Sequence, residues 1–161
     1  MEALRENNAA QASIGRGQRF ARRLGAALTV VALLPGAMPV ADLHVDIQKL
    51  RSAKGMIRVC LTADPKNFPG CVDDSRAVTR SVRADAPNIV FQALPQGDYA
   101  VAVIHDENGN KKLDTFAGIP REGFGFSRNP AIGFGPPKFA AARFSLTSDA
   151  TEQPIRMKYL L

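Results

Sequence analysis

Four oxygen-bearing side chains recur at regular spacing in the middle of the chain and point to cation chemistry. Asp106, Asn108, Asn110 and Asp114 occupy positions 1, 3, 5 and 9 of a D-x-N-x-N-x-x-x-D string. Lys112, at position 7, would add its backbone carbonyl oxygen. Alternate side chains on a curling loop can converge on one point, and Ca²⁺ takes roughly six to eight oxygen ligands. The segment is therefore a candidate Ca²⁺ loop.

A structural turn competes with this interpretation. Position 6, where an EF-hand has the glycine of its sharp turn, holds Lys111, and position 12 holds Ala117 in place of a bidentate glutamate. Asn108-Gly109 is a preferred dipeptide of the type I′ turn, because both residues tolerate positive φ. In such a turn the Asp and Asn side chains would bond the nearby backbone. We favour the turn and keep the cation site as the alternative.

Residues suited to hydrolysis are few. His105 adjoins Asp106, but neighbours on a strand point to opposite faces, so adjacency does not make a catalytic pair. Ser127 lies in GFSRN, which lacks the second glycine of a G-x-S-x-G elbow. We therefore predict no enzyme, and a small hydrolase that uses His105 and the loop carboxylates is a secondary alternative.

A binding surface fits the composition of the following segment better. Residues 118–137, GIPREGFGFSRNPAIGFGPP, combine aromatic rings, exposed glycine backbone and arginines. Loops on a rigid scaffold commonly carry recognition. The alternative is that the rings only cover a sheet. We predict contact with a peptide, a carbohydrate or another envelope protein through Phe116, Arg121, Phe124, Phe126, Arg128 and Phe134.

The two cysteines, Cys60 and Cys71, are separated by ten residues. Redox-active pairs usually have about two residues between them, and a metal site would need more ligands than His44 and His105 supply. In an oxidising compartment an even pair of cysteines indicates a disulfide bond. We predict one structural disulfide.

The elements that must position these residues are short strands. Apolar and polar residues alternate with period 2, and glycine- and proline-containing breaks separate the runs. No convincing helical period follows residue 42. We predict an all-β fold, a seven-stranded antiparallel β-sandwich with one long Gly/Phe-rich loop over about 106–138. The expected strands are 43–48, 56–63, 77–84, 88–94, 97–106, 139–147 and 153–161.

One of these strands is apolar on both faces, so something besides the opposite sheet must cover it. The faces carry Tyr99, Val101 and Val103 on one side and Ala100, Ala102 and Ile104 on the other. Four of the nine phenylalanines lie in the long loop and Phe139 follows it directly, and disordered segments are poor in such residues. We expect an ordered loop, pinned by its rings, to form the cover.

The N-terminal segment has the layout of an export signal. Arg19, Arg22 and Arg23 precede an apolar run over 24–34, too short for a bilayer span of about 20 residues. We predict a signal peptide over 1–41 and a single domain over 42–161. Cleavage after Ala41 is preferred, cleavage after Ala37 is the alternative, and an uncleaved anchor is the competing interpretation. The predicted location is periplasmic or secreted.

Without residues 1–41 the net charge falls from +6 to +3, because this segment carries five of the 21 basic and two of the 15 acidic residues. No basic stripe with interleaved aromatics remains, which argues against nucleic-acid binding. The predicted mature chain has no transmembrane span.

Two motifs resemble known families. FQALPQGDY, over 91–99, resembles the F-x-x-L-P-x-G-x-Y signature of transthyretin-like and Cna-B-like modules. Together with CLTADPKNFPGC, HDENGNKKLDT, GIPREGFGFSRNP and GFGPPKF, it resembles the bacterial exported family named domain of unknown function 2141. The resemblance implies an exported, β-rich protein of transthyretin- or immunoglobulin-like type. We expect a non-catalytic binding or accessory module of the cell envelope, with a Ca²⁺-stabilised structural module as the alternative.

Overall fold

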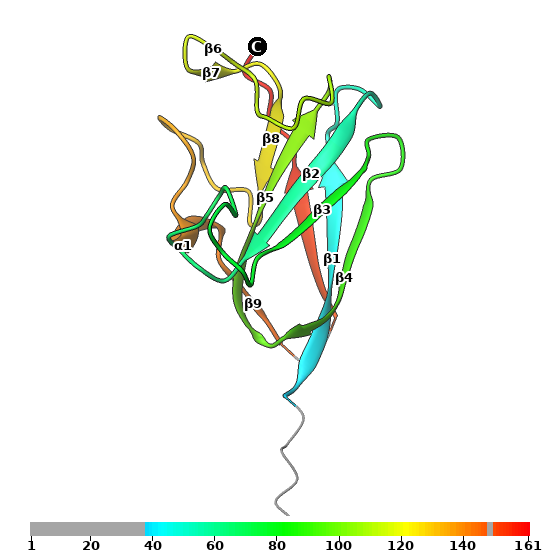
Figure 1. Cartoon of the computed structure of the whole chain (residues 1–161), viewed down its shortest axis with the longest axis vertical. Helices are drawn as coiled ribbons and strands as arrows, with labels where there is room; N and C mark the ends of the chain where they lie inside the picture. The colour runs from blue at the N-terminus through cyan, green and yellow to red at the C-terminus, as the bar shows by residue number, and fades with distance from the viewer. Residues whose placement is uncertain (1–37, 148–149) are drawn as a thin grey trace, which may run out of the picture. The chain divides into compact units, whose positions relative to one another are not determined.

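The computed structural model describes residues 38–147 and 150–161, which belong to the second of two compact units of the chain, 36–161 (Figure 1). This part is all-β apart from one helical turn, α1 (Phe139–Ala142). The longer strands are β1 (Val40–Gln48), β2 (Met56–Thr62), β3 (Val78–Arg83), β4 (Asn88–Pro95), β5 (Gly97–Asp106) and β10 (Thr151–Arg156). The shorter strands are β6 (Thr115–Phe116), β7 (Ile119–Pro120), β8 (Gly123–Phe126) and β9 (Phe144–Leu146).

Two main sheets carry the fold. The first has the order β10-β1-β4 and the second β3-β2-β5-β8, with β9 paired to the start of β5. The expectation of purely antiparallel pairing is wrong at one position, because β1 and β10 run parallel, with Leu43 opposite Thr151 and Gln48 opposite Arg156. After β9 the chain crosses to the first sheet and enters it at the same end as β1.

Each of the seven expected segments contains a strand, but the number seven is too low. Within the supposed loop, β6 and β7 form a small hairpin and β8 joins the second sheet. The expected strand at 139–147 begins as α1 and becomes β9 only at Phe144, and the last strand ends at Arg156.

One core fills the space between the two sheets. Alternate residues of the strands point into it, as period 2 requires. Leu43, Val45 and Ile47 of the first sheet contribute to the same buried cluster as Val59 and Val103 of the second. The sheets are therefore held by a shared apolar interior.

Glycine and phenylalanine alternate in β8 because its two faces meet different neighbours. A Cβ on Gly125 would lie 2.7 Å from Cγ2 of Ile155, so the inward face leaves room only for hydrogen. The outward rings of Phe124 and Phe126 pack with Ala100 and Ala102 of β5 in a second buried cluster. This confirms the expectation that the phenylalanine-rich segment covers the outer face of β5.

Candidate functional site

The carboxylate of Asp106 organises the segment that follows β5. Its Oδ1 accepts hydrogen bonds from the backbone N–H groups of Gly109 and Asn110, at 2.7 and 3.0 Å. Its Oδ2 accepts from the backbone N–H of Lys111 at 2.9 Å and from Nε of Arg58 at 2.5 Å. The carboxylate is fully buried, so these four donors replace its water.

The remaining oxygens of the loop are engaged in the same way. Oδ1 of Asn108 accepts from the N–H of Asn110, and Oδ1 of Asn110 accepts from the N–H of Lys112. Both amide groups donate to the carboxylate of Asp114, at 2.7 and 2.8 Å. The expected backbone bonding by Asp and Asn side chains is therefore confirmed.

The type I′ geometry is wrong. Positive φ occurs at Gly109 and at Lys111, with φ +77° and +67°, and not at Asn108. Asp106 bonds three successive backbone N–H groups, and this bonding sets the course of the loop in place of a two-residue hairpin turn. Lys111 thus makes the sharp turn for which an EF-hand uses glycine.

Charge in the loop is balanced by protein groups. Burial raises the pKa of Asp106, but the hydrogen bonds from Arg58 and from the backbone outweigh it, so the net pKa lies below the ordinary value. Within the described residues, no group of three or more His, Cys, Asp or Glu side chains is arranged to hold a metal ion. Ca²⁺ binding stays the alternative interpretation of this loop, and an ion would have to displace existing donors.

The residues considered for hydrolysis lie inside the protein. The ring of His105 is fully buried, with Nε2 2.8 Å from the carbonyl of Lys54 and Nδ1 2.7 Å from the hydroxyl of Tyr159. Since a carbonyl only accepts, Nε2 donates to the carbonyl of Lys54. Ser127 is also fully buried, and its hydroxyl donates to the carbonyl of Ala142. Both side chains fix neighbouring segments to each other.

The six residues predicted to bind a partner lie in three places. Phe124 and Phe126 are buried at 6% and 7% exposure, so their rings are not available to a partner. Phe116 and Arg121 lie in or beside the β6–β7 hairpin, where Phe116 is exposed. Phe134, also exposed, and Arg128 lie in the connection between β8 and α1.

Cys60 and Cys71 form a disulfide, as predicted. It closes the loop over 61–70, the disulfide loop, against the covered face of β5. Cys60 lies on β2, and the loop carries Phe68, whose peptide bond to Pro69 is cis. The ring of Phe68 lies 5.8 Å from that of Phe126 and 6.0 Å from that of Phe139, centroid to centroid. The loop and α1 are thereby joined through their rings.

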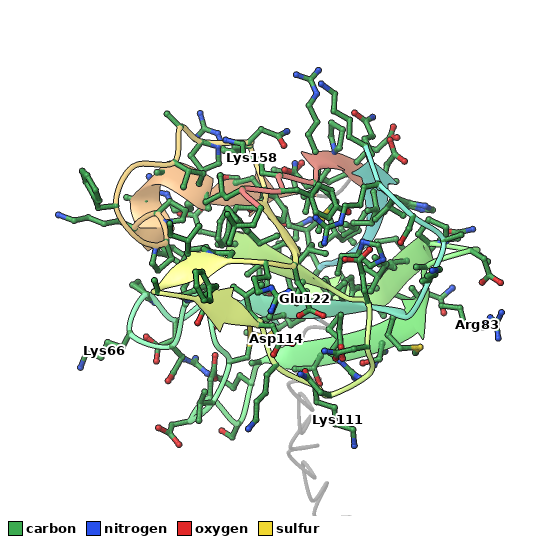
Figure 2. All side chains as sticks on the ribbon, turned by 90° about the horizontal axis from the view of Figure 1, so that it is seen from above. Lys66, Arg83, Lys111, Asp114, Glu122 and Lys158 are labelled. Atoms are coloured by element: carbon green, nitrogen blue, oxygen red, sulfur yellow. A yellow bond between two sulfur atoms is a disulfide. The ribbon has the colours of Figure 1, made fainter. Side chains whose placement is uncertain are left out.

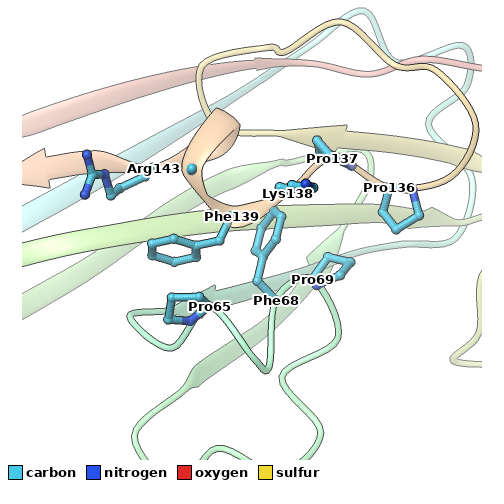
Figure 3. Close-up of a pocket in the computed structure, with 9 residues that line it drawn as sticks. Pro65, Phe68, Pro69, Pro136, Pro137, Lys138, Phe139 and Arg143 are labelled. Carbon is cyan, nitrogen blue, oxygen red and sulfur yellow. The ribbon is translucent and has the colours of Figure 1, made fainter.

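Beside this contact lies an open groove of about 640 Å³ (Figure 3). Residues of the disulfide loop face residues on and before α1 across it. Four prolines and two phenylalanines dominate its walls, and two cations lie at its rim. The lining residues are Pro65, Phe68, Pro69, Pro136, Pro137, Lys138, Phe139, Ala140 and Arg143.

The groove offers apolar contact and positive charge but few hydrogen-bond donors. Proline has no backbone N–H, so four of its lining residues cannot donate from the main chain. Lys138 is exposed, and Arg143 pairs with Asp98 at 3.3 Å, where both side chains are about half exposed. Such a pair contributes little stability and can exchange for a ligand anion.

Sequence reasoning missed the groove residues although their signals were present. NFPGC, over 67–71, and GPPKF, over 135–139, each place phenylalanine beside proline, and both were noticed only as family motifs. About 70 residues separate the two segments in the chain. Only the pairing of β5 with both β2 and β8 brings them together.

Comparison with known proteins identifies the family. Residues 45–154 match the family described as "Uncharacterized protein conserved in bacteria (DUF2141)", and the chain belongs to it, as its motifs predicted. No curated protein and no solved structure matches the chain. Among the described residues no helix has both the length and the apolar character needed to cross a bilayer.

Proposed function

We propose that this protein is an exported, non-catalytic binding module of the cell envelope, built on a sandwich of transthyretin- or immunoglobulin-like type. The groove between the disulfide loop and α1 is its ligand site. The observation that carries the proposal is the combination of Phe68, Phe139 and four prolines with the rim cations Lys138 and Arg143. The volume lies in the usual range for ligand sites, roughly 300–1,000 Å³.

The ligand that fits this lining is a peptide segment with apolar side chains and a carboxylate. Apolar walls favour aromatic or aliphatic groups, and the rim cations favour an anion. A carbohydrate would need several polar partners for its hydroxyl groups, and the prolines supply none from their backbone nitrogens. Binding without catalysis is supported by the burial of His105 and Ser127, whose polar atoms serve internal hydrogen bonds.

A peptide array tests the proposal. Its peptides vary independently in aromatic content and in acidic content, and the protein is applied as wild type and as Lys138→Glu. We expect retention of peptides that combine both features, and at least a roughly tenfold loss with Lys138→Glu, because the variant repels the anion. Lys112→Glu, an equal change of charge at another exposed lysine, should leave retention unchanged. No selective retention, or equal retention by Lys138→Glu, would overturn the proposal.

Export rests on the N-terminal segment, whose residues 1–37 lie outside the described part of the chain. The position of Ala41 favours cleavage after Ala37. Ala41 is buried in the core at 6% exposure and pairs with Leu94 of β4. A cut after Ala41 would therefore remove the first two residue pairs between β1 and β4, Val40 with Pro95 and Ala41 with Leu94. N-terminal sequencing of the processed protein should start at Met38, and a start at Asp42 would refute this site.

A further inference from the structure

At the end of the molecule opposite to the start of β1, four apolar side chains face solvent. Phe116 and Ile119 are paired across the β6–β7 hairpin and are 66% and 44% exposed. Leu160 and Leu161 follow β10 and are 52% and 54% exposed. We name these four residues the apolar tip. They are half of the eight large hydrophobic residues that are exposed in the described chain.

One guanidinium joins the two halves of the tip. Nη1 of Arg51 donates to the carbonyl of Leu161 at 2.6 Å, and Nη2 donates to the carbonyl of Arg121 at 2.8 Å, directly after β7. Figure 1 shows the hairpin and the C-terminal end side by side. The two halves of the tip therefore come from two separate segments that flank the guanidinium of Arg51.

The base of the hairpin is held firmly. The N–H of Arg121 donates to the carbonyl of Asp114 at 2.8 Å. Glu122 is buried and accepts from the N–H groups of Glu107 and Asp114, at 3.0 and 3.1 Å. Figure 2 looks down on this end and shows Asp114 and Glu122 close together, with Lys111 directed outward. The exposed side chains of Phe116 and Ile119 thus project from an ordered support.

Positive charge surrounds the tip. The connecting segments at this end, 49–55, 84–87, 107–122 and 157–161, hold seven lysines and arginines and four acidic residues. The four acidic side chains are either buried or already engaged by protein groups. Glu122 is buried, Glu107 pairs with Arg51, Asp85 pairs with Arg83, and Asp114 accepts from two amide groups. Lys111, Lys112 and Arg121 are exposed in the same segment, 107–122, that carries Phe116 and Ile119.

Projecting apolar residues ringed by cations match an anionic lipid surface. A small ligand needs a concave site, whereas these side chains project from a hairpin and from the segment after β10, and the groove described above is lined by other residues. A lipid interface deforms around protruding rings, its acyl region accepts Phe, Ile and Leu, and its phosphates attract Lys and Arg. We propose that the apolar tip docks the protein peripherally on an anionic membrane, independently of the groove.

Co-sedimentation with vesicles tests this inference. The full chain and its variants, all with the same N-terminal segment, are mixed with vesicles of phosphatidylcholine alone or with added phosphatidylglycerol. We expect wild-type binding to the phosphatidylglycerol vesicles, weakened by salt. Phe116→Ser with Ile119→Ser should lower the partition coefficient at least about tenfold, since two apolar groups no longer enter the interface. Lys111→Glu with Lys112→Glu should lower it by a similar factor.

Two matched controls distinguish binding through the tip from nonspecific hydrophobic adsorption and from binding through the groove. Phe134→Ser removes an even more exposed phenylalanine elsewhere, and Lys138→Glu reverses a groove cation, so both should bind vesicles as the wild type does. Unchanged binding of the Phe116/Ile119 variant, absence of wild-type binding, or an equal loss with Phe134→Ser would each overturn the proposal. In the case of absent wild-type binding, specific retention of an envelope protein would assign the tip to a protein partner instead.

Discussion

The rings of Phe68 and Phe139 meet edge to face, with centroids 6.0 Å apart and planes at 83°. Phe68 lies in the loop closed by the disulfide, and Phe139 begins α1. Edge-to-face contact is a favoured arrangement for aromatic pairs and contributes beyond burial alone. This contact fixes the two walls of the groove relative to each other, so the disulfide and the proposed ligand site are coupled.

Loss of the disulfide should therefore weaken both stability and binding. For Cys60→Ser with Cys71→Ser we expect a decrease of up to about 3 kcal/mol in the free energy of unfolding, because the closed loop is short. Retention on the peptide array should fall as well. Urea unfolding measures the first effect, and a reducing agent should destabilise the wild type but not the double variant. Undiminished peptide retention by the variant would show that the loop does not shape the site.

Close packing on the inward face of β8 gives a second expectation. In Gly125→Ala the new methyl group would lie 2.7 Å from Cγ2 of Ile155 and 3.1 Å from Sδ of Met157. Overpacking of this kind costs about 1–3 kcal/mol. Gly133→Ala is the matched control, since no atom lies within 4 Å of its added Cβ. Thermal unfolding of the two variants should separate them, and equal midpoints would contradict the assignment of β8 to the core.

The buried carboxylate of Asp106 makes stability depend on pH. Its pKa in the folded protein is lowered from the unfolded value of 3.8, because the donors from Arg58 and the backbone outweigh the effect of burial. The stabilisation is thus complete above the unfolded pKa and is lost as pH falls through the folded pKa. Asp106→Asn should be about 3 kcal/mol less stable near neutral pH and should lose less on acidification.

Asp85→Asn supplies the comparison for this pH effect. The hydrogen bond from Arg83 also lowers the pKa of Asp85, but this pair is exposed and screened by solvent. Denaturant unfolding from pH 7 to pH 2 should leave the Asp85 variant close to the wild type. An Asp106 variant with the same acid sensitivity as the wild type would argue against this role of the carboxylate.

Calcium should not stabilise the protein. Both oxygens of Asp106 and both of Asp114 already accept hydrogen bonds, and Arg58 supplies the positive charge beside Asp106. A native-state ligand at a hundredfold excess over Kd would add about 2.7 kcal/mol. We expect the same unfolding midpoint in EDTA and in millimolar Ca²⁺. If Ca²⁺ raised the unfolding midpoint by several degrees and Asp114→Ala abolished this rise, the loop would be a Ca²⁺ site after all.

Much of the fold could be predicted because it follows from local rules. Period-2 alternation located the seven expected strands, and the two apolar faces of β5 required the cover that Phe124 and Phe126 provide. β8 was missed because glycines at alternate positions look like turn residues, although here they make room for Ile155 and Met157. The parallel pairing of β1 with β10 depends on a long-range crossing that no local pattern encodes.

The candidate site was harder to predict, because it too depends on contacts between segments that are far apart in the sequence. The disulfide followed from cysteine spacing, and the side-chain bonding of the Asp106 loop followed from its Asp and Asn content. Which phenylalanines are exposed depends on strand pairing, so Phe124 and Phe134 could not be told apart. The groove requires the contact of Phe68 with Phe139, and that contact exists only once the sheet is formed.

Nuclear magnetic resonance with an aromatic anion tests the central claim most directly. Anilinonaphthalene sulfonate, which combines apolar rings with a negative charge, is titrated into isotope-labelled protein. The groove predicts chemical-shift changes centred on Phe68, Lys138 and Phe139, and their loss in Lys138→Glu. Shifts confined to the surroundings of Phe116 or Phe134, or the same shifts in Lys138→Glu, would contradict a ligand site between the disulfide loop and α1.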